Sequence, residues 1–211
     1  MSVSSSKEAI LKKIRKALST STPLPFPQSE GNNSLYQPSQ QELELQFAET
    51  FTGLQGRFAF CLDYNELGAQ LNDLVRGKGW TKIYCTETAL KQQLEAGGFS
   101  SFAGHSLADC DASITTCENL VARTGTIVMT AATQSGRTAS VYAPIHICIA
   151  HTRQLVYDVK DALQSVKEKY AGNLPSLITF ASGPSRTADI EKTLVVGVHG
   201  PGEVYVFLVD Q

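Results

Sequence analysis

The run PIHICIA, residues 144–150, decides the fold class because it is apolar at almost every position. Other runs share this character, although some are more mixed: RFAFCL at 57–62, WTKIYC at 80–85, GTIVMTAA at 125–132, SLITFAS at 176–182 and EVYVFLVD at 203–210. Strands that are apolar throughout are typical of parallel sheets buried on both faces. We therefore expect these runs to be strands of such a sheet.

Helical patterns separate the apolar runs. Asp63 with Glu66 predicts the start of a helix over 64–79, and residues 87–98 predict a second helix that ends in two glycines. RQLVYDVKDALQSVKEKY, residues 153–170, carries apolar residues at helical spacing. The alternation predicts an α/β fold, mainly a parallel sheet with helices on both faces. In such folds ligands bind in the loops beyond the carboxyl ends of the strands.

The first 56 residues differ from the rest. Ser5 with Glu8 predicts the start of a basic helix whose stripe is Ile10, Leu11, Ile14 and Leu18. A Pro-, Ser- and Asn-rich stretch follows, and Ser39 with Glu42 predicts another helix start. The expected organisation is a helical arm and linker at 1–56 and an α/β domain at 57–211. The apolar stripe could dock onto the chain's own body or onto a partner subunit.

Composition limits the class of protein. The 211 residues are 42% hydrophobic and 18% charged, with a net charge of −2, which indicates a globular protein and gives no electrostatic case for binding nucleic acid. No apolar run is long enough to span a membrane, and the N-terminal stretch lacks the apolar centre of a signal peptide, so we expect a cytoplasmic protein. The five cysteines show no C-x-x-C spacing, which favours buried structural thiols without a metal or cluster.

The loop GPSRTADIE, residues 183–191, is the first candidate site. We expect it at the carboxyl end of the strand over 176–182, leading into a helix. Gly183 would permit the tight exit, and Ser185 or Thr187 would cap the helix, whose unpaired N–H groups favour an anion. Arg186 would add a bidentate fork for a phosphate or carboxylate.

The two acids that follow, Asp189 and Glu191, have open roles. They could complement the helix dipole, orient Arg186 or act as acid/base groups. For Glu191 the dipole role is the favoured interpretation.

The loop GVHGP, residues 197–201, is the second candidate site. Gly197 and Gly200 would let the backbone approach a ligand closely, and His199 could transfer a proton, donate to an anion or bind a metal.

Two more candidate residues have structural alternatives. Arg137 is either a second anion-binding group or a solvated loop charge, and His146 is either a ligand-binding residue or a core imidazole.

The order of these motifs resembles the LUD domain, the family of lactate utilization protein C. The resemblance covers roughly residues 57–211 and rests on ARTGTIVM, the loop with Arg137, PIHICIA, GPSRTADIE and GVHGPGEVYVFL. It implies a fold similar to the ribose-phosphate isomerase and CoA-transferase superfamily. It also implies a role in oxidising L-lactate to pyruvate together with two iron–sulfur lactate utilization proteins. The clusters would lie in those partners, because this chain lacks ferredoxin-type cysteine motifs.

The family's catalytic residues are not assigned, so only motif positions carry over. These are Gly183, Pro184, Ser185, Arg186, Thr187, Asp189, Glu191, Gly197, His199, Gly200 and Pro201. One departure is TQSGRTASVYAP, residues 133–144, where many relatives have a more apolar link rich in Leu and Pro, so the lining of the site differs here.

Three functions follow from these observations. The first is a cluster-free subunit of a lactate-oxidising complex that binds a small carboxylate or phosphorylated ligand. The others are a stand-alone enzyme for a phosphorylated or CoA-linked substrate and an anion-sensing regulatory protein. The catalytic candidates are His199, Asp189 and Glu191, and no metal site is expected. The ligand-binding candidates are Gly183, Ser185, Arg186, Thr187, Arg137, His146, Gly197 and Gly200.

Overall fold

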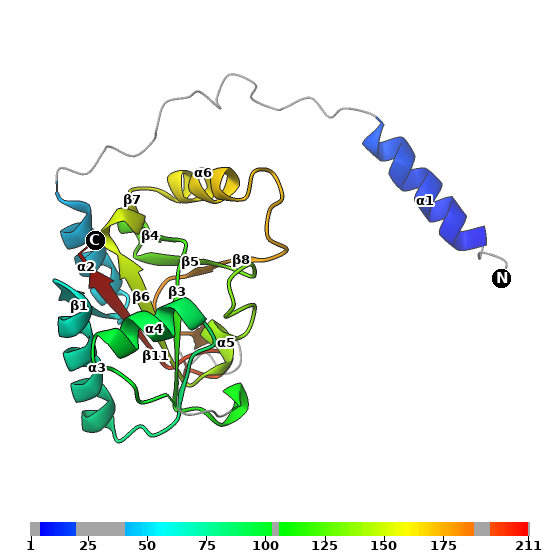
Figure 1. The fold of residues 1–211 in the computed structure, drawn as a ribbon. Coiled ribbons are helices and arrows are strands. Elements are labelled where there is room, and N and C mark those ends of the chain that lie inside the picture. Colours follow the sequence, from blue (N-terminus) through cyan, green and yellow to red (C-terminus); the bar gives the residue numbers. More distant parts are fainter. Residues whose placement is uncertain (1–4, 20–40, 103–105, 188–194, 211) are drawn as a thin grey trace. The chain divides into compact units, whose positions relative to one another are not determined.

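A computed structural model describes residues 5–19, 41–102, 106–187 and 195–210 (Figure 1). The chain divides into two compact units, residues 1–37 and 38–211. The first unit contains α1 (Ser5–Leu18), which is the predicted basic helix and exposes Ile10, Leu11 and Ile14. The compositional boundary after residue 56 falls inside the second unit, since helix α2 (Leu43–Gly53) buries Phe47 and Phe51 in the core of that unit.

The second unit is built on a five-stranded sheet in which every neighbouring pair is parallel. Its strands in spatial order are β1 (Arg57–Cys61), β11 (Glu203–Val209), β6 (Ile145–His151), β3 (Ala112–Thr116) and β2 (Ile83–Tyr84). The expected α/β class with a mainly parallel sheet is therefore confirmed. Strand β3, which occupies a position between β6 and β2, was not predicted.

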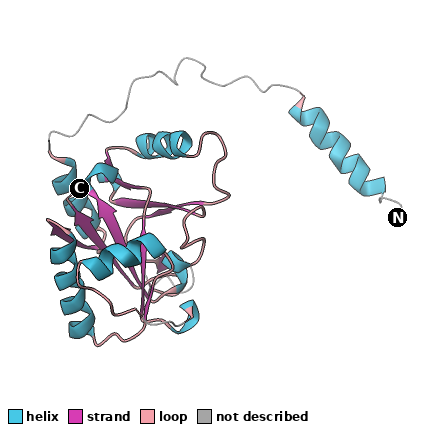
Figure 2. Cartoon of the chain, in the orientation of Figure 1, coloured by secondary structure: helices cyan, strands magenta, loops and turns pink. Residues whose placement is uncertain are grey.

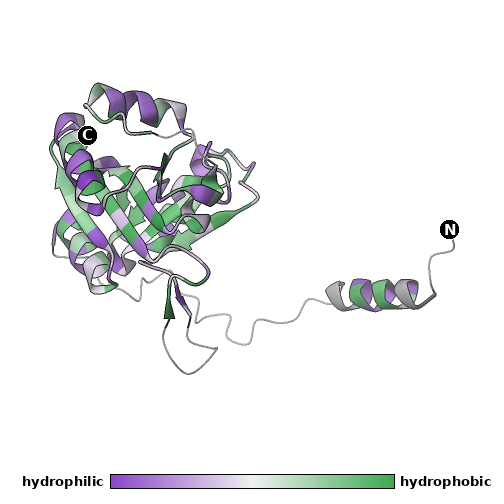
Figure 3. Ribbon diagram, turned by 90° about the horizontal axis from the view of Figure 1, so that it is seen from below, coloured by the Kyte–Doolittle hydropathy of each residue, from purple (hydrophilic) through white to green (hydrophobic). Residues whose placement is uncertain are grey.

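Two helices cover one face of this sheet. Helix α3 (Tyr64–Lys78) contributes Leu67 and Leu71, and α4 (Thr88–Ala96) contributes Leu90, to a core shared with Ile147 and Phe207. The side chain of the residue before α3 caps the helix as predicted, accepting bonds of 2.8 Å from two backbone N–H groups. Figure 3 shows apolar residues along the strands and mixed character on the helices.

The opposite face of the sheet packs against α2 and a second sheet. This sheet has the order β7 (Leu155–Val156), β4 (Asn119–Val121), β5 (Thr126–Thr130) and β8 (Ile178–Ala181). Its β4–β5 and β5–β8 pairs are antiparallel. Helix α6 (Val159–Lys169) packs against it through Ala162, beside Val121 and Val128. Figure 2 shows the helices and strands of the chain in the same orientation as Figure 1.

Several predicted elements need correction. The runs at 125–132 and 176–182 form β5 and β8 of the second sheet, so they do not belong to the parallel one. The helix expected from residue 153 begins at Val159, because η3 (Thr152–Gln154) and β7 precede it and Asp158 caps it. Helix α2 begins at Leu43, and no side chain caps it.

The remaining described elements are short. They are η1 (Leu107–Asp109), η2 (Ala122–Thr124), α5 (Ala139–Tyr142), β9 (Arg186–Thr187) and β10 (Val195–Val196). Within the described ranges, no helix combines the length and the apolar character that crossing a membrane requires.

Candidate functional site

The two candidate loops meet in the structure. Ser185 donates its N–H to the carbonyl of Pro201 at 2.9 Å, and Gly197 donates its N–H to the carbonyl of Ser185 at 3.0 Å. Strands β9 and β10 then pair in antiparallel fashion, with Thr187 opposite Val195. The loops that sequence analysis singled out therefore form one structural unit.

Their position differs from the predicted one. Gly202 donates its N–H to the carbonyl of Pro144 at 2.8 Å, just before β6, and β11 starts one residue later. The unit therefore lies at the amino ends of two parallel strands, because β8 belongs to the other sheet and does not deliver its loop to the carboxyl edge.

Arg186 and Thr187 form β9, so neither residue is part of a helix and Ser185 does not cap one. The residues that would follow a cap at Thr187 lie outside the described part of the chain. The helix N–H groups expected to bind an anion are therefore not provided by these residues. Asp189 and Glu191 lie outside the described residues.

Two glycines explain the close packing of this unit. Gly183 has φ of +80°, and a Cβ there would lie 2.6 Å from the carbonyl oxygen of Leu54. A Cβ on Gly200 would lie 3.0 Å from the Cβ of Ser185. Side chains at these positions would separate the two loops from each other and from α2.

A hollow of about 590 Å³ lies beside the second loop. Its lining residues are Val141, Tyr142, Ala143, Pro144, Gly197, Val198, His199 and Gly200. His199 is exposed at this hollow, where its imidazole can exchange a proton or donate to an anion.

The other predicted ligand-binding residues are placed differently. Arg186 is exposed and donates from its guanidinium to the carbonyl of Leu54. Arg137 donates to Ser176 Oγ at 2.6 Å. His146 is buried within β6, with its Nε2 2.8 Å from Thr115 Oγ1, and burial lowers its pKa to about 4. This contact fits the core-imidazole alternative.

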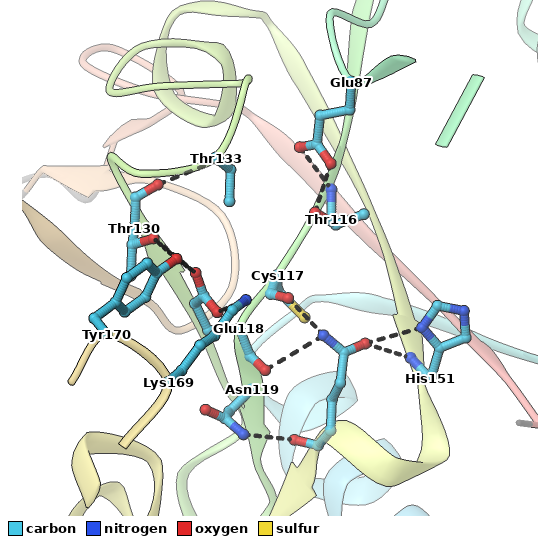
Figure 4. Close-up of polar contacts among 11 residues, drawn as sticks. Glu87, Thr116, Cys117, Glu118, Asn119, Thr130, Thr133, His151, Lys169 and Tyr170 are labelled. Carbon is cyan, nitrogen blue, oxygen red and sulfur yellow. Dashed lines mark hydrogen bonds and ion pairs between the residues drawn. The ribbon is translucent and has the colours of Figure 1, made fainter. Parts of the chain in front are cut away.

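Sequence analysis missed a buried polar cluster beyond the carboxyl end of β3 (Figure 4). Glu118 accepts from Thr130 Oγ1 at 2.7 Å, Tyr170 OH at 2.6 Å and Lys169 Nζ at 2.6 Å. Burial alone would raise the pKa of Glu118, but these three donors outweigh burial and hold the pKa below its ordinary value. The cluster joins β4 and β5 to the end of α6.

A second buried carboxylate lies on the other side of β3. Glu87 accepts from the backbone N–H of Thr116 at 3.1 Å, from its hydroxyl at 2.5 Å and from Ser135 Oγ at 2.6 Å. Next to it, Gln134 Oε1 accepts from the N–H of Thr88 at 2.7 Å. The polar loop after β5 is thereby fixed to the start of α4.

A buried imidazole completes this edge. His151 Nε2 lies 3.0 Å from Tyr64 OH, and its Nδ1 lies 3.2 Å from Gln154 Oε1. Gln154 Oε1 also accepts the backbone N–H of His151, and since an amide oxygen only accepts, the ring bonds to it as the Nδ1–H tautomer. Tyr64 OH lies 3.0 Å from both Nε2 and Gln93 Oε1 and has one hydrogen for the two acceptors. Burial lowers the pKa of His151, which favours the neutral ring.

The carboxyl-edge rule applied to β3 would have located these residues. Residues 112–116, ASITT, carry one strongly apolar side chain, Ile114, so hydrophobicity gave no strand signal. The carboxylates accept bonds from their own neighbours, which indicates a structural role in holding α4, α6 and the second sheet at this edge. Within the described part of the chain, no group of three or more His, Cys, Asp or Glu residues is arranged to hold a metal, and the five cysteines are buried.

Comparisons with known proteins place the motifs in a family. The family model for the LUD domain matches residues 100–209. A lactate utilization protein C from Shouchella clausii is 38% identical over 101 residues, which are 47% of this chain and 44% of the relative. Its counterpart from Halalkalibacterium halodurans is 40% identical over 93 residues, 43% of this chain and 40% of the relative. The chain thus matches less than half the length of these relatives.

A solved structure shares the fold. The crystal structure of a DUF162 family protein from Deinococcus radiodurans superposes with a TM-score of 0.60 at 20% identity. The superposition covers 82% of this chain and 99% of the other.

Proposed function

The chain belongs to the LUD domain family, and from this membership we propose that it serves lactate utilization in the cytoplasm. In this proposal it is a cluster-free subunit that works with two iron–sulfur proteins in the oxidation of L-lactate to pyruvate. The support is that relatives named lactate utilization protein C are 38% and 40% identical over 101 and 93 residues, and that the matching family model spans residues 100–209, which include both loops. The two electrons from lactate would pass to clusters in the partner proteins.

The ligand in this proposal is a small carboxylate or a phosphorylated compound bound at the GPSRTADIE and GVHGP loops. The observation that carries it is the meeting of the two loops beside a hollow in which His199 is exposed. Arg186 lies on the same unit, and its bond to Leu54 uses one of five guanidinium N–H donors. A protonated imidazole and a guanidinium fork are suitable donors for a carboxylate or phosphate.

The test is purification of the tagged full chain from its native cell without oxygen. We expect a brown eluate that contains two iron–sulfur proteins and oxidises L-lactate. The same purification with His199→Gln separates assembly from ligand binding, because the variant should retain the partners and lose lactate oxidation. Arg137→Gln changes a residue that does not line the hollow and bonds to Ser176, so it is the control and should behave as the unmodified chain.

A colourless, solitary protein without lactate oxidation would contradict the proposal. The loops would then be tested against phosphorylated and CoA-linked compounds.

A further inference from the structure

Strand β1 lies at the end of the parallel sheet and, among the described residues, pairs with a strand on one side alone. Phe60 and Leu62 on this edge are 41% and 68% exposed, and Leu45 of α2 is also exposed. Phe58 packs against Phe47, whereas α2 leaves the later part of the strand uncovered. A groove of about 750 Å³ runs beside the start of the strand, lined in part by Arg57, Phe58 and Gln70.

The outer edge of β1 presents hydrogen-bonding groups that none of the described strands satisfies. The carbonyl of Phe60 accepts a long bond of 3.4 Å from Gln70 Nε2, and the N–H of Leu62 donates to Glu66 Oε2 at 2.8 Å. Both partners are side chains of α3, so these main-chain groups point away from β11. Because main-chain groups alternate in direction along a strand, those of Phe58 point outward as well. An added strand would pair with residues 58, 60 and 62.

The sequence of this edge is complementary to itself in one antiparallel register. With Phe60 opposite its own copy, Ala59 faces Cys61, Phe58 faces Leu62 and Arg57 faces Asp63. Opposite charges and apolar side chains face each other at the positions where cross-strand pairs stabilise a sheet. Arg57 also pairs with Glu203 at 3.1 Å and Asp63 also caps α3, so the apolar pairs carry most of this complementarity. Asp63 still has extended backbone, with φ of −155° and ψ of −178°, so the pairing can reach the last position.

We propose that β1 pairs with β1 of a second copy of this chain across a two-fold axis centred on Phe60. The pairing joins the two five-stranded sheets edge to edge and places Phe60, Leu62 and Leu45 of each copy at the interface. A two-fold interface requires such a self-complementary surface. It also protects an exposed apolar edge, which otherwise invites aggregation. The side chains of Glu66 and Gln70 move aside as the second strand binds.

The position of Phe60 on the axis gives a specific test with the full chain. In a dimer of Phe60→Lys two ammonium groups would face each other, and in a dimer of Phe60→Glu two carboxylates would. Because like charges opposite each other repel, the dimer dissociation constant of each variant should be at least about tenfold higher than that of the unmodified chain. An equimolar mixture of the two variants should form a heterodimer, because opposite charges then meet. Sedimentation velocity measures dissociation, and native mass spectrometry identifies the mixed species.

Phe180 provides the matched control, since it is 42% exposed on β8, the edge strand of the second sheet. Phe180→Lys should leave the dimer unchanged.

A second pair of variants does not depend on charge. Phe60→Cys should form a disulfide with its own copy under mild oxidation, because Cα atoms directly opposite in such a pair lie about 5.5 Å apart, and Phe180→Cys should not.

Three results would overturn the proposal. One is an unmodified chain that stays monomeric at every concentration. Another is a dimer that neither charged variant weakens, which would indicate a different interface. The last is a pair of weakened variants that fail to recover on mixing, since Phe60 would then not face its own copy.

Discussion

His199 is exposed at a hollow that the GVHGP loop borders, so its side chain is available to a ligand without supporting the core. We expect L-lactate, pyruvate or inorganic phosphate to raise the melting temperature of the unmodified chain. At a ligand concentration of a hundredfold Kd, binding adds about 2.7 kcal/mol to the free energy of unfolding. His199→Gln should remove this rise and leave the unliganded melting temperature nearly unchanged.

Arg186→Ala tests the neighbouring donor with differential scanning fluorimetry. It should also remove the ligand-dependent rise, and it should lower the unliganded stability by about 1 kcal/mol through its lost bond to Leu54. Arg137→Gln is the control that should retain the rise. Normal stabilisation of both loop variants would exclude the loops as the ligand site.

Glu118 is a buried carboxylate with three donors, and its lowered pKa makes it a source of pH-dependent stability. The unfolded chain takes up the proton first as pH falls, so the stabilisation is present above the ordinary pKa of 4.5 and is lost as pH falls through the lower folded value. Glu118→Gln should cost about 2 kcal/mol at neutral pH, mostly from the bonds to Tyr170 and Thr130, because Lys169 is largely exposed.

Urea unfolding at a series of pH values measures this difference. The gap between the unmodified chain and Glu118→Gln should narrow below pH 4.5. Glu95→Gln changes an exposed carboxylate of α4 and should have little effect at any pH. A gap that is constant with pH would show that packing, rather than the ionised carboxylate, accounts for the loss.

At the scale of elements, Asp63 and Glu42 form a natural comparison because each occupies the N-cap position of a helix. Asp63 accepts from the N–H groups of Asn65 and Glu66, whereas the side chain of Glu42 caps nothing. Asp63→Ala should therefore reduce the free energy of unfolding, and Glu42→Ala should change it little. Equal losses in urea titrations would contradict the capping assignment.

Local signals of this kind were predictable from the sequence, and non-local ones were not. The cap at Asp63 and the glycines after α4 involve neighbours in the chain, so pattern alone located α3 and α4. Leu155 and Val156 fit a helical stripe equally well, but pairing with β4 makes them a strand. Arg186 and Thr187 likewise follow a turn suited to a helix start, yet their pairing with β10 decides their conformation.

At the scale of the whole molecule, the sequence predicted where strands occur better than it predicted which strands pair with one another. Apolar runs predicted β5, β6, β8 and β11 alike, although two of these belong to a second sheet. Assigning β8 to the parallel sheet placed the candidate site at the carboxyl ends of the strands, whereas it lies at the amino ends of β6 and β11. The carboxyl-edge rule holds only for strands of the parallel sheet. The two candidate loops nevertheless meet in the structure, through the backbone bonds of Ser185 with Pro201 and Gly197.

Helix α2 lies in the core of the second unit, so its removal distinguishes two possible boundaries of the folded body. Phe47 and Phe51 are fully buried and stack with ring centroids 5.3 Å apart, against Val206 and Leu208 of the central sheet. A chain of residues 38–211 should retain a cooperative thermal transition. A chain of residues 57–211 should lose it, since each buried phenylalanine contributes about 3–5 kcal/mol, which is comparable to the stability of a typical domain. Circular dichroism melts decide between the two boundaries, and a fully cooperative 57–211 protein would show that α2 is an accessory to the fold.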